Sequence, residues 1–263
     1  MTRLDVALVE RGLARSRGQA RELLDAGRVV LDGAPARKPA TPVRPEQSLD
    51  VTGAPEPWVG RAAYKLLAAL DAFTGLSVQG RRCLDVGAST GGFTQVMLAR
   101  GAREVVALDV GHGQLAPEVA ADERVVERSG TTIRDATAES LDGPFDVLVV
   151  DLSFISLPLV LPVLAGLLAA DGDVVLLVKP QFEVGRSRLG KDGVVRSAAY
   201  RRDALRGVLR AATDSGLGVR DIIASPVPGT TGNREYLVWV AAREPGRLAG
   251  PDIERLVEQV EPT

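Results

Sequence analysis

The sequence predicts an α/β protein in which helices cover a parallel sheet, preceded by a small α+β domain. Segments such as 147–150 and 174–178 are continuously apolar, which is typical of strands buried on both faces. Helical patterns separate these segments, and strands that alternate with helices form parallel sheets. The Pro- and Gly-rich stretch GAPEP at 53–57 indicates a linker that sets the small domain apart.

Length and composition favour two unequal domains. The chain has 263 residues, 45% of them hydrophobic and 25% charged, as in an ordinary soluble globular protein. We expect a small domain at 1–52, a linker at 53–57 and a large domain at 58–263.

The small domain shows patterns for two helices followed by short strands. Leu4 and Leu8 have helical spacing. Ser16 can cap a second helix, with Gln19 three residues later as its capping-box partner. The segment RVVLDG predicts a strand that ends in an Asp-Gly turn, and another strand lies near 48–51.

In the large domain, predicted helices alternate with predicted strands. The expected order is a helix at 60–73, a strand at 81–89, a helix at 91–100, a strand at 103–110, a short strand at 124–127, a strand at 145–153, an apolar helical region at 157–170, a strand at 173–180, a helix at 197–215, and strands at 219–226 and 235–242. A ligand should bind where such strands end.

Several classes of protein are disfavoured. A single cysteine, Cys83, excludes a disulfide framework, and a single histidine, His112, argues against a zinc site or a Ser-His-Asp hydrolase. We therefore expect no metal. The apolar stretch 157–170 has 14 residues, whereas a bilayer span needs roughly 20. No signal peptide is visible, so we expect a cytoplasmic protein without a membrane partner.

The cations are unevenly distributed. Arginine accounts for 28 of the 32 basic residues, and residues 1–45 carry nine basic against five acidic side chains. This excess suits an RNA-facing surface, although a solvated face paired with Glu10, Glu22 and Asp25 would look the same. The candidate RNA-binding residues are Arg3, Arg11, Arg15, Arg17, Arg21, Arg28 and Lys38, together with Arg61 and Arg134 of the large domain.

A glycine turn, DVGASTGGFT at 85–94, joins a strand to a helix. Its G-x-x-x-G-G spacing differs from the dinucleotide fingerprint G-x-G-x-x-G. Asp85 precedes the turn, and Asp109 ends the next strand, where an acid can accept hydrogen bonds from ribose hydroxyls. S-adenosylmethionine, which carries positive charge and no phosphate, suits these acids. The alternative is a glycine turn that binds no ligand.

The candidate cofactor-binding residues are Asp85, Gly87, Ala88, Ser89, Thr90, Gly91, Gly92, Phe93, Asp109 and Val110.

Two further charged residues end neighbouring strands. Asp151 follows one apolar strand and Lys179 the next, so we expect their side chains to be close. Burial at the end of a strand favours the neutral lysine that a general base requires, while a structural salt bridge is the simpler alternative. Taken alone, Lys65 is expected to be a solvated helix charge, and Glu235 an ordinary strand-edge charge.

Five motifs together resemble the TlyA family of ribosomal RNA 2′-O-methyltransferases, within the wider FtsJ-like group. They are RAAYKL, LDVGASTGGFT, VVDLSFISLP, VKPQFEVG and PVPGTTGNREYLVW. Residues 3–33 resemble the RNA-binding domain named after the fourth small-subunit ribosomal protein.

The resemblance implies a Rossmann-like, S-adenosylmethionine-dependent methyltransferase that modifies a cytidine ribose in small- and large-subunit rRNA. The group's catalytic tetrad falls on Lys65, Asp151, Lys179 and Glu235. Lys179 would be the base, Asp151 and Lys65 would orient it, and Glu235 would hold Lys65. The expected partners are ribosomal RNA or ribosomal subunits, bound by a monomer or weak homodimer.

Three alternatives are open on the sequence alone. They are a non-catalytic rRNA-binding assembly factor, a nicotinamide-dependent oxidoreductase, and a membrane-active toxin. The glycine spacing disfavours the second, and the lack of an apolar span disfavours the third.

Overall fold

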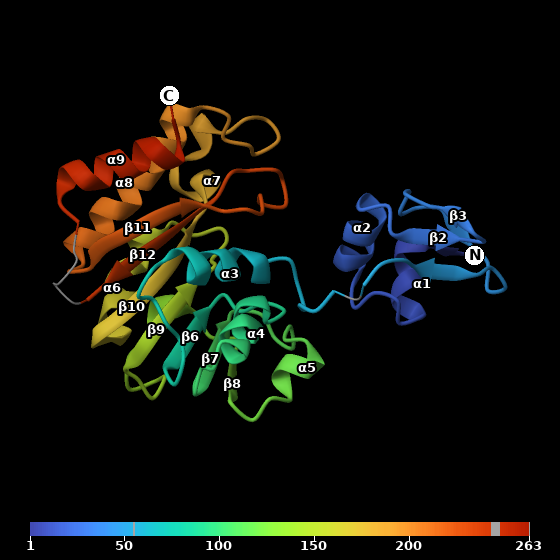
Figure 1. Cartoon of the computed structure of the whole chain (residues 1–263), viewed down its shortest axis with the longest axis horizontal. Helices are drawn as coiled ribbons and strands as arrows, with labels where there is room; N and C mark the ends of the chain where they lie inside the picture. The colour runs from blue at the N-terminus through green and yellow to red at the C-terminus, as the bar shows by residue number, and fades with distance from the viewer. Residues whose placement is uncertain (55, 243–247, 263) are drawn as a thin grey trace. The chain divides into compact units, whose positions relative to one another are not determined.

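The computed structural model describes residues 1–54, 56–242 and 248–262, which form two compact units (Figure 1). The small unit is Met1–Pro57 and the large unit is Trp58–Thr263. The predicted fold class is confirmed, because the large unit contains a mostly parallel sheet and the small unit mixes helices with short strands. Within the described ranges, no helix has the length and apolar character needed to cross a membrane.

The small unit packs two helices against short strands. Its elements are β1 (Thr2–Arg3), α1 (Leu4–Glu10), α2 (Arg17–Asp25), β2 (Val29–Leu31), β3 (Ala34–Pro35), β4 (Pro42–Val43) and β5 (Leu49–Val51). Strand β2 lies between β3 and β5, and β1 pairs with β4. Leu4, Leu8, Leu24 and Val29 are fully buried in its core.

Two local signals in the small unit are confirmed. The Ser16 hydroxyl accepts a hydrogen bond from the Gln19 backbone N–H at 3.2 Å and caps α2. The Gln19 side chain, however, accepts from the N–H of Arg15 at 2.7 Å and not from the cap residue. Asp32 and Gly33 have φ values of 49° and 79°, as a two-residue type I′ hairpin requires.

The large unit has a seven-stranded sheet in the order β11-β12-β10-β9-β6-β7-β8. Its helices and strands are α3 (Ala63–Ala72), β6 (Arg82–Val86), α4 (Gly92–Ala99), β7 (Glu104–Asp109), α5 (Pro117–Ala120), β8 (Val125–Ser129), η1 (Ile133–Asp135), β9 (Phe145–Val150), η2 (Leu157–Leu159), α6 (Leu161–Leu167), β10 (Leu168–Val178), α7 (Pro180–Glu183), η3 (Arg186–Arg188), α8 (Ala198–Asp214), β11 (Gly218–Ala224), β12 (Tyr236–Ala241) and α9 (Gly250–Val260).

Two details differ from the sequence prediction. The apolar region 157–170 is not one helix, because it divides into η2, α6 and the first residues of β10. Strand β12 runs antiparallel to both neighbours, β10 and β11. The segment between β11 and β12 contains no crossover helix, and strands joined without a crossover run antiparallel.

Helices cover both faces of the sheet (Figure 1). On one face, Leu66 of α3, Phe73 directly after it and Met97 of α4 form a buried cluster with Cys83 of β6. On the other face, α6, α8 and α9 pack against alternate strand residues such as Leu84. Burial raises the pKa of the Cys83 thiol to about 12, which makes this cysteine unreactive.

This arrangement brings five strand ends to one edge. The carboxyl ends of β6, β7, β9 and β10 lie there because these strands are parallel. The amino end of β12 joins them because β12 is antiparallel to β10. Polar residues at these ends are therefore neighbours although they are distant in sequence.

Candidate active site

Lys179 and Asp151 form an ion pair at the carboxyl ends of β10 and β9. Lys179 Nζ lies 2.6 Å from Asp151 Oδ1 and donates a hydrogen bond to Ser153 Oγ at 2.9 Å. The two strands are parallel neighbours, so the expected closeness of these side chains is confirmed. Lys179 is 9% exposed.

Lys65 and Glu235 form a second pair, deeper in the protein. Lys65 Nζ lies 2.6 Å from Glu235 Oε2, and the two residues are 6% and 3% exposed. The interpretation of each residue taken alone, a solvated helix charge and an ordinary strand-edge charge, is therefore wrong, and the pairing is the one that the family resemblance implied. Helix α3 turns Lys65 toward the sheet beside buried Leu66, and Tyr236 pairs with Val178, which places Glu235 next to Lys179 in the register.

Two cavities meet at the loop that follows β9. One has a volume of about 450 Å³ and is lined by residues that include Asp109 and Asp151. The other has a volume of about 760 Å³ and is lined by residues that include Lys179 and Glu235. Residues 153–155 line both cavities. The ion pair between Asp151 and Lys179 therefore joins the walls of the two cavities.

The smaller cavity is suited to a positively charged ligand. Among its described lining residues, Asp109 and Asp151 are the charged ones, and none is a lysine or arginine. Leu108, Val110 and Ile133 add apolar surface. A pyrophosphate would meet two carboxylates, of which only Asp151 is paired with a cation, whereas a sulfonium or ammonium group would be stabilised by the carboxylate of Asp109.

Four of the ten predicted cofactor-binding residues line this cavity. They are Gly87, Ser89, Asp109 and Val110. The other six, namely Asp85, Ala88, Thr90, Gly91, Gly92 and Phe93, lie outside its lining. The cavity also includes Gln114, Thr132 and Leu152, which sequence reasoning missed. The signal for Gln114 was its place only five residues after Asp109.

Asp85 lies beneath the glycine turn and is fully buried. Thr94 Oγ1 donates a hydrogen bond to Asp85 Oδ2 at 2.6 Å, while Oδ1 has no hydrogen-bond partner among the described residues. Burial raises the pKa of Asp85 to about 7, against the opposing hydrogen bond from Thr94. This carboxyl group therefore holds the start of α4 from below and is poised between its neutral and charged forms near neutral pH.

Two turn glycines are required by close approaches within the chain itself. A Cβ atom at Gly87, which has φ +88°, would collide with the backbone carbonyl oxygen of Asp151. A Cβ atom at Gly91, which has φ +89°, would lie 2.9 Å from Val119 of α5. Gly87 thus lets the turn after β6 approach the residue that pairs with Lys179.

Asp109 connects the turns after β6 and β7. Its Oδ2 accepts a hydrogen bond from the Ser89 N–H at 2.8 Å. Its Oδ1 accepts from the Gly111 N–H at 2.7 Å and from Gln114 Nε2 at 3.0 Å. The carboxylate is therefore fixed in orientation on the wall of the smaller cavity.

Asn233 connects two loops that line the larger cavity. It is 1% exposed, its Nδ2 donates to the Gly193 carbonyl at 3.0 Å, and its Oδ1 accepts from the Val195 N–H at 2.9 Å. Nδ2 also donates to Thr231 Oγ1 at 3.0 Å. Because Asn233 lies two residues before Glu235, these bonds also fix the approach to the buried ion pair.

Several predicted RNA-binding arginines make bonds inside the small unit. Arg17 and Arg3 pair with the buried Asp5 at 2.8 and 3.0 Å, and their hydrogen bonds lower the pKa of Asp5 to about 2. Arg11 donates to the carbonyl of Gln47 at 2.7 Å. Arg28 donates to the carbonyls of residues 52 and 54. The alternative partners Glu10, Glu22 and Asp25 are not the ones that Arg3 and Arg17 use.

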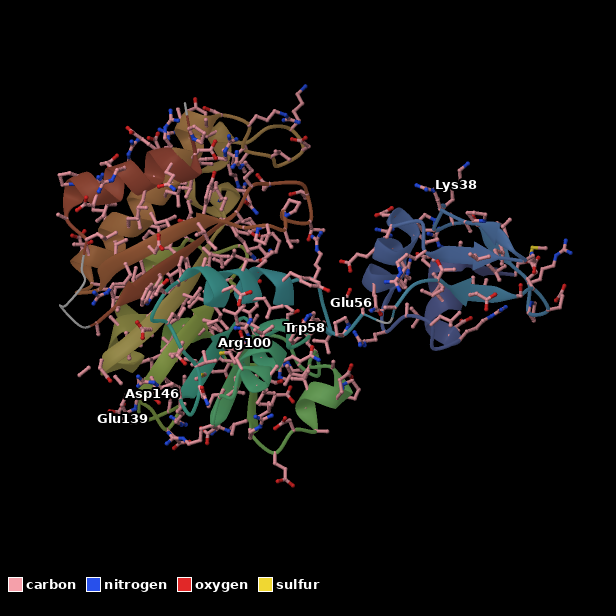
Figure 2. All side chains as sticks on the ribbon, in the orientation of Figure 1. Lys38, Glu56, Trp58, Arg100, Glu139 and Asp146 are labelled. Atoms are coloured by element: carbon pink, nitrogen blue, oxygen red, sulfur yellow. The ribbon has the colours of Figure 1, made fainter. Side chains whose placement is uncertain are left out.

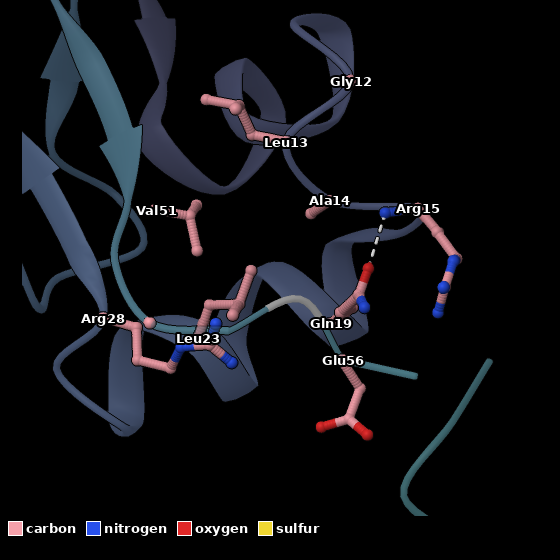
Figure 3. A pocket seen from close by; sticks show the side chains of 10 residues that line it. Gly12, Leu13, Ala14, Arg15, Gln19, Leu23, Arg28, Val51 and Glu56 are labelled. Atoms are coloured by element: carbon pink, nitrogen blue, oxygen red, sulfur yellow. Dashed lines mark hydrogen bonds between the residues drawn. The ribbon is translucent and has the colours of Figure 1, made fainter. Parts of the chain in front are cut away.

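Other predicted RNA-binding residues are differently placed. Arg21 and Lys38 are exposed on the small unit, where Lys38 extends from the surface (Figure 2). Arg15 and Arg28 line a pocket of about 320 Å³ whose floor includes Leu23 (Figure 3).

In the large unit, the two predicted RNA-binding arginines lie near the cavities. Arg61 donates to Thr230 Oγ1 at 3.0 Å, on the rim of the larger cavity. Arg134 is exposed and follows Ile133, which lines the smaller cavity.

Comparison with known proteins decides the family. Residues 58–242 match the model described as FtsJ-like methyltransferase, and residues 2–49 match the S4 domain. The chain belongs to the TlyA branch of the FtsJ-like methyltransferase family. The predicted resemblance is therefore confirmed.

Individual relatives cover nearly the whole of this FtsJ-like methyltransferase. It is 49% identical over 258 residues to the 16S/23S rRNA (cytidine-2′-O)-methyltransferase TlyA of Mycobacterium tuberculosis, covering 98% of this chain and 96% of the relative. It is 36% identical over 236 residues to Hemolysin A of Brachyspira hyodysenteriae, covering 89% and 98%. The solved structure of a putative hemolysin from Streptococcus thermophilus gives a TM-score of 0.78 at 38% identity, covering 98% and 95%.

Proposed function

We propose that this protein transfers a methyl group from S-adenosylmethionine to the ribose 2′-hydroxyl of a cytidine in ribosomal RNA. The observation that carries the proposal is the pair Asp151–Lys179, which joins two cavities at the carboxyl edge of the sheet. The relative from Mycobacterium tuberculosis, whose name gives this reaction, supports the choice of substrate.

The smaller cavity fits the methyl donor. Asp109 offers a carboxylate to ribose hydroxyls, the apolar wall suits an adenine ring, and the two carboxylates favour the positive charge of the sulfonium and amino groups. Bound there, the donor would supply an already activated methyl group. The absence of a cation among the described lining residues argues against a nicotinamide dinucleotide.

The larger cavity fits a nucleotide that has left its stack. Phe154 is 91% exposed between the two cavities, and its ring centroid lies 5.1 Å from that of Phe182. An exposed aromatic surface beside a cavity suits stacking with an unpaired base. Lys179 lines the same cavity, so a 2′-hydroxyl placed beside the base would lie within reach of its amine.

Lys179 is the proposed base. Methyl transfer would form a carbon–oxygen bond at the 2′-oxygen and break the methyl–sulfur bond of the donor, which would leave as S-adenosylhomocysteine. The oxygen–hydrogen bond breaks as well, and the neutral amine of Lys179 accepts that proton. The carboxylate of Asp151 then stabilises the resulting ammonium, and Ser153 orients it. Lys65 and Glu235 hold the neighbouring wall. Most of the rate gain comes from alignment of the two reactants, because the methyl donor needs no further activation.

A direct assay tests the reaction. Radiolabelled S-adenosylmethionine with isolated ribosomal subunits, followed by mapping of 2′-O-methyl positions, should give a labelled cytidine. Label in neither subunit would favour the non-catalytic assembly factor. Leakage from liposomes without any methyl transfer would favour the membrane-active toxin that the names of some relatives suggest.

The donor site has its own test. Asp109→Ala should weaken binding of S-adenosylmethionine by about 1.5–3 kcal/mol, because hydrogen bonds to a charged acceptor are lost. Calorimetric titration measures this change, and an unchanged affinity would exclude Asp109 from the site.

We also propose that the small unit captures rRNA through exposed cations. Replacing both Arg21 and Lys38 by Ala should lower RNA affinity and reduce the slope of log affinity against log salt by about 0.7–0.9 per lost phosphate contact. Arg17→Ala is the contrasting variant, because Arg17 pairs with Asp5. A cytoplasmic monomer or weak homodimer that acts on ribosomal subunits is the form of the protein we propose.

A further inference from the structure

Gln114 donates a hydrogen bond to the carboxylate of Asp109, the group that a cofactor ribose would need. Asp109 lies on the wall of the smaller cavity, and Gln114 folds back so that its Nε2 donates to Asp109 Oδ1 at 3.0 Å. Ser89 Oγ lies 3.4 Å from the other end of the same amide. An exposed side chain thus lies directly on the group proposed to bind the cofactor.

The hydrogen-bonding capacity of Asp109 is nearly filled. A carboxylate has about four acceptor sites. The N–H groups of Ser89 and Gly111 and the Nε2 of Gln114 use three of them. A ribose diol that donates two hydrogen bonds needs two sites, so one of the three present donors must leave.

Gln114 is the donor that can leave. Ser89 and Gly111 donate from the backbone of the turns after β6 and β7, which the sheet holds in place. Gln114 donates from a flexible, exposed side chain. Rotation of that side chain frees one acceptor site without any change in the fold.

Gly111 is what permits Gln114 to fold back. A Cβ atom at position 111 would collide with Nε2 of Gln114, the far end of a side chain, and would lie 3.2 Å from Asp109 Oδ1, a tight contact that leaves the carboxylate in place. The backbone of Gly111 lies outside the left-handed region, so an alanine there is compatible with the chain. Gly111→Ala therefore evicts Gln114 from Asp109 without removing the glutamine.

We propose that the Gln114 side chain competes with the cofactor ribose for Asp109. It rotates away from Asp109 when the nucleoside binds and returns when the nucleoside leaves. The inference rests on the proposed use of S-adenosylmethionine. The ribose is the same in S-adenosylhomocysteine, so Gln114 weakens substrate and product binding alike and speeds product release. The measured affinity equals the affinity of the open site multiplied by the fraction of molecules in which the site is open.

Calorimetry with S-adenosylmethionine and S-adenosylhomocysteine tests the proposal on the full chain. If the site is open in about one molecule in ten, Gln114→Ala and Gly111→Ala should each bind both ligands about tenfold more tightly than the natural protein. Gln79→Ala, an exposed glutamine at the opposite edge of the sheet, is the matched control and should change neither affinity. In an Asp109→Ala background, Gln114→Ala should have no further effect, because its partner is gone.

The outcomes separate the two proposals. If the natural protein binds neither ligand, the proposed cofactor is wrong. If it binds them and Gln114→Ala binds them equally or more weakly, the cofactor stands and the competitor role of Gln114 is overturned. A side-chain amide signal of Gln114 that does not move when S-adenosylhomocysteine is added to ¹⁵N-labelled protein would also overturn it.

Discussion

The two lysine–carboxylate pairs of the active site have the same length but different surroundings. Both have an N–O distance of 2.6 Å. The side chains of Lys65 and Glu235 are 8% and 2% exposed, while those of Lys179 and Asp151 are 11% and 17% exposed. The first pair, the buried pair, borders one cavity through Glu235, and the second, the open pair, borders both cavities. Geometry alone would make the pairs equivalent, whereas the greater solvent access of the open pair is the reason why we propose a supporting role for the buried pair and proton transfer for the open one.

The largest expected effect comes from removing the proton-accepting ability of the open pair. Lys179→Arg keeps the positive charge beside Asp151, but a guanidinium does not lose its proton near neutral pH. Single-turnover methyl transfer should fall by about 10²–10⁴-fold, with S-adenosylmethionine affinity unchanged. A near-normal rate would leave Lys179 an electrostatic role only.

Breaking the buried pair should lower the stability of the fold. Lys65→Met leaves the Glu235 carboxylate buried without a cation, which costs about 3–5 kcal/mol in unfolding free energy. Urea denaturation measures the loss. The double variant Lys65→Met, Glu235→Leu should recover most of that stability, since it leaves no unpaired buried charge. If the double variant also recovered full activity, the pair would be dispensable for the reaction.

Asp85 extends the comparison to a buried carboxyl group that has no cation. Its pKa is about 7 in the folded protein, above the ordinary value of 3.8, so the folded state binds the proton more tightly than the unfolded chain. Stability should therefore fall as pH rises from about 4 to 7, by on the order of 4 kcal/mol, and be constant in this respect above pH 7. Asp85→Asn should flatten that slope in urea denaturation series. An equally steep slope in the variant would assign the pH dependence to other groups.

The smallest effect should come from Ser153→Ala. The variant removes one hydrogen bond to Lys179 Nζ and keeps the ion pair with Asp151. Methyl transfer should slow by about tenfold, the lower end expected for a hydrogen bond to a charged group. The pH–rate profile should shift as well, which a purely structural role of Ser153 would not cause. Loss of activity as large as in Lys179→Arg would show that Ser153, and not Asp151, controls the lysine.

Most strands of the sheet could be predicted from the sequence because buried parallel strands are continuously apolar and alternate with helical segments. Asp151 and Lys179 could be placed together because adjacent strands have to end side by side. The burial of Lys65 and Glu235 could not be predicted from either residue, since it depends on which face of α3 meets the sheet and on the reversed direction of β12.

The roles of the arginines were less predictable. Their number in the small unit is visible in the sequence, but their partners are not. Arg17 meets Asp5 across 12 residues, and Arg11 meets the carbonyl of Gln47 across 36. Such contacts depend on the packing of helices against short strands, which no local pattern encodes. Exposure does not separate candidates such as Lys38 from arginines that hold the unit together, because Arg11 and Arg17 are exposed as well; the bonds of Arg11 and Arg17 within the unit do.

The position of β12 in the sheet determines the order in which parts of the fold can be completed during synthesis. Strand β11 precedes β12 in the chain, yet β12 lies between β11 and β10 in the sheet. During synthesis, β11 emerges before the strand with which it pairs in the finished sheet, because that partner is β12 and not β10. The same late strand carries Glu235 to its place beside Lys65. A nascent chain that ends after α7 therefore already contains both Asp151 and Lys179, whereas the Lys65–Glu235 pair can form only after the segment that enters β12 has been made.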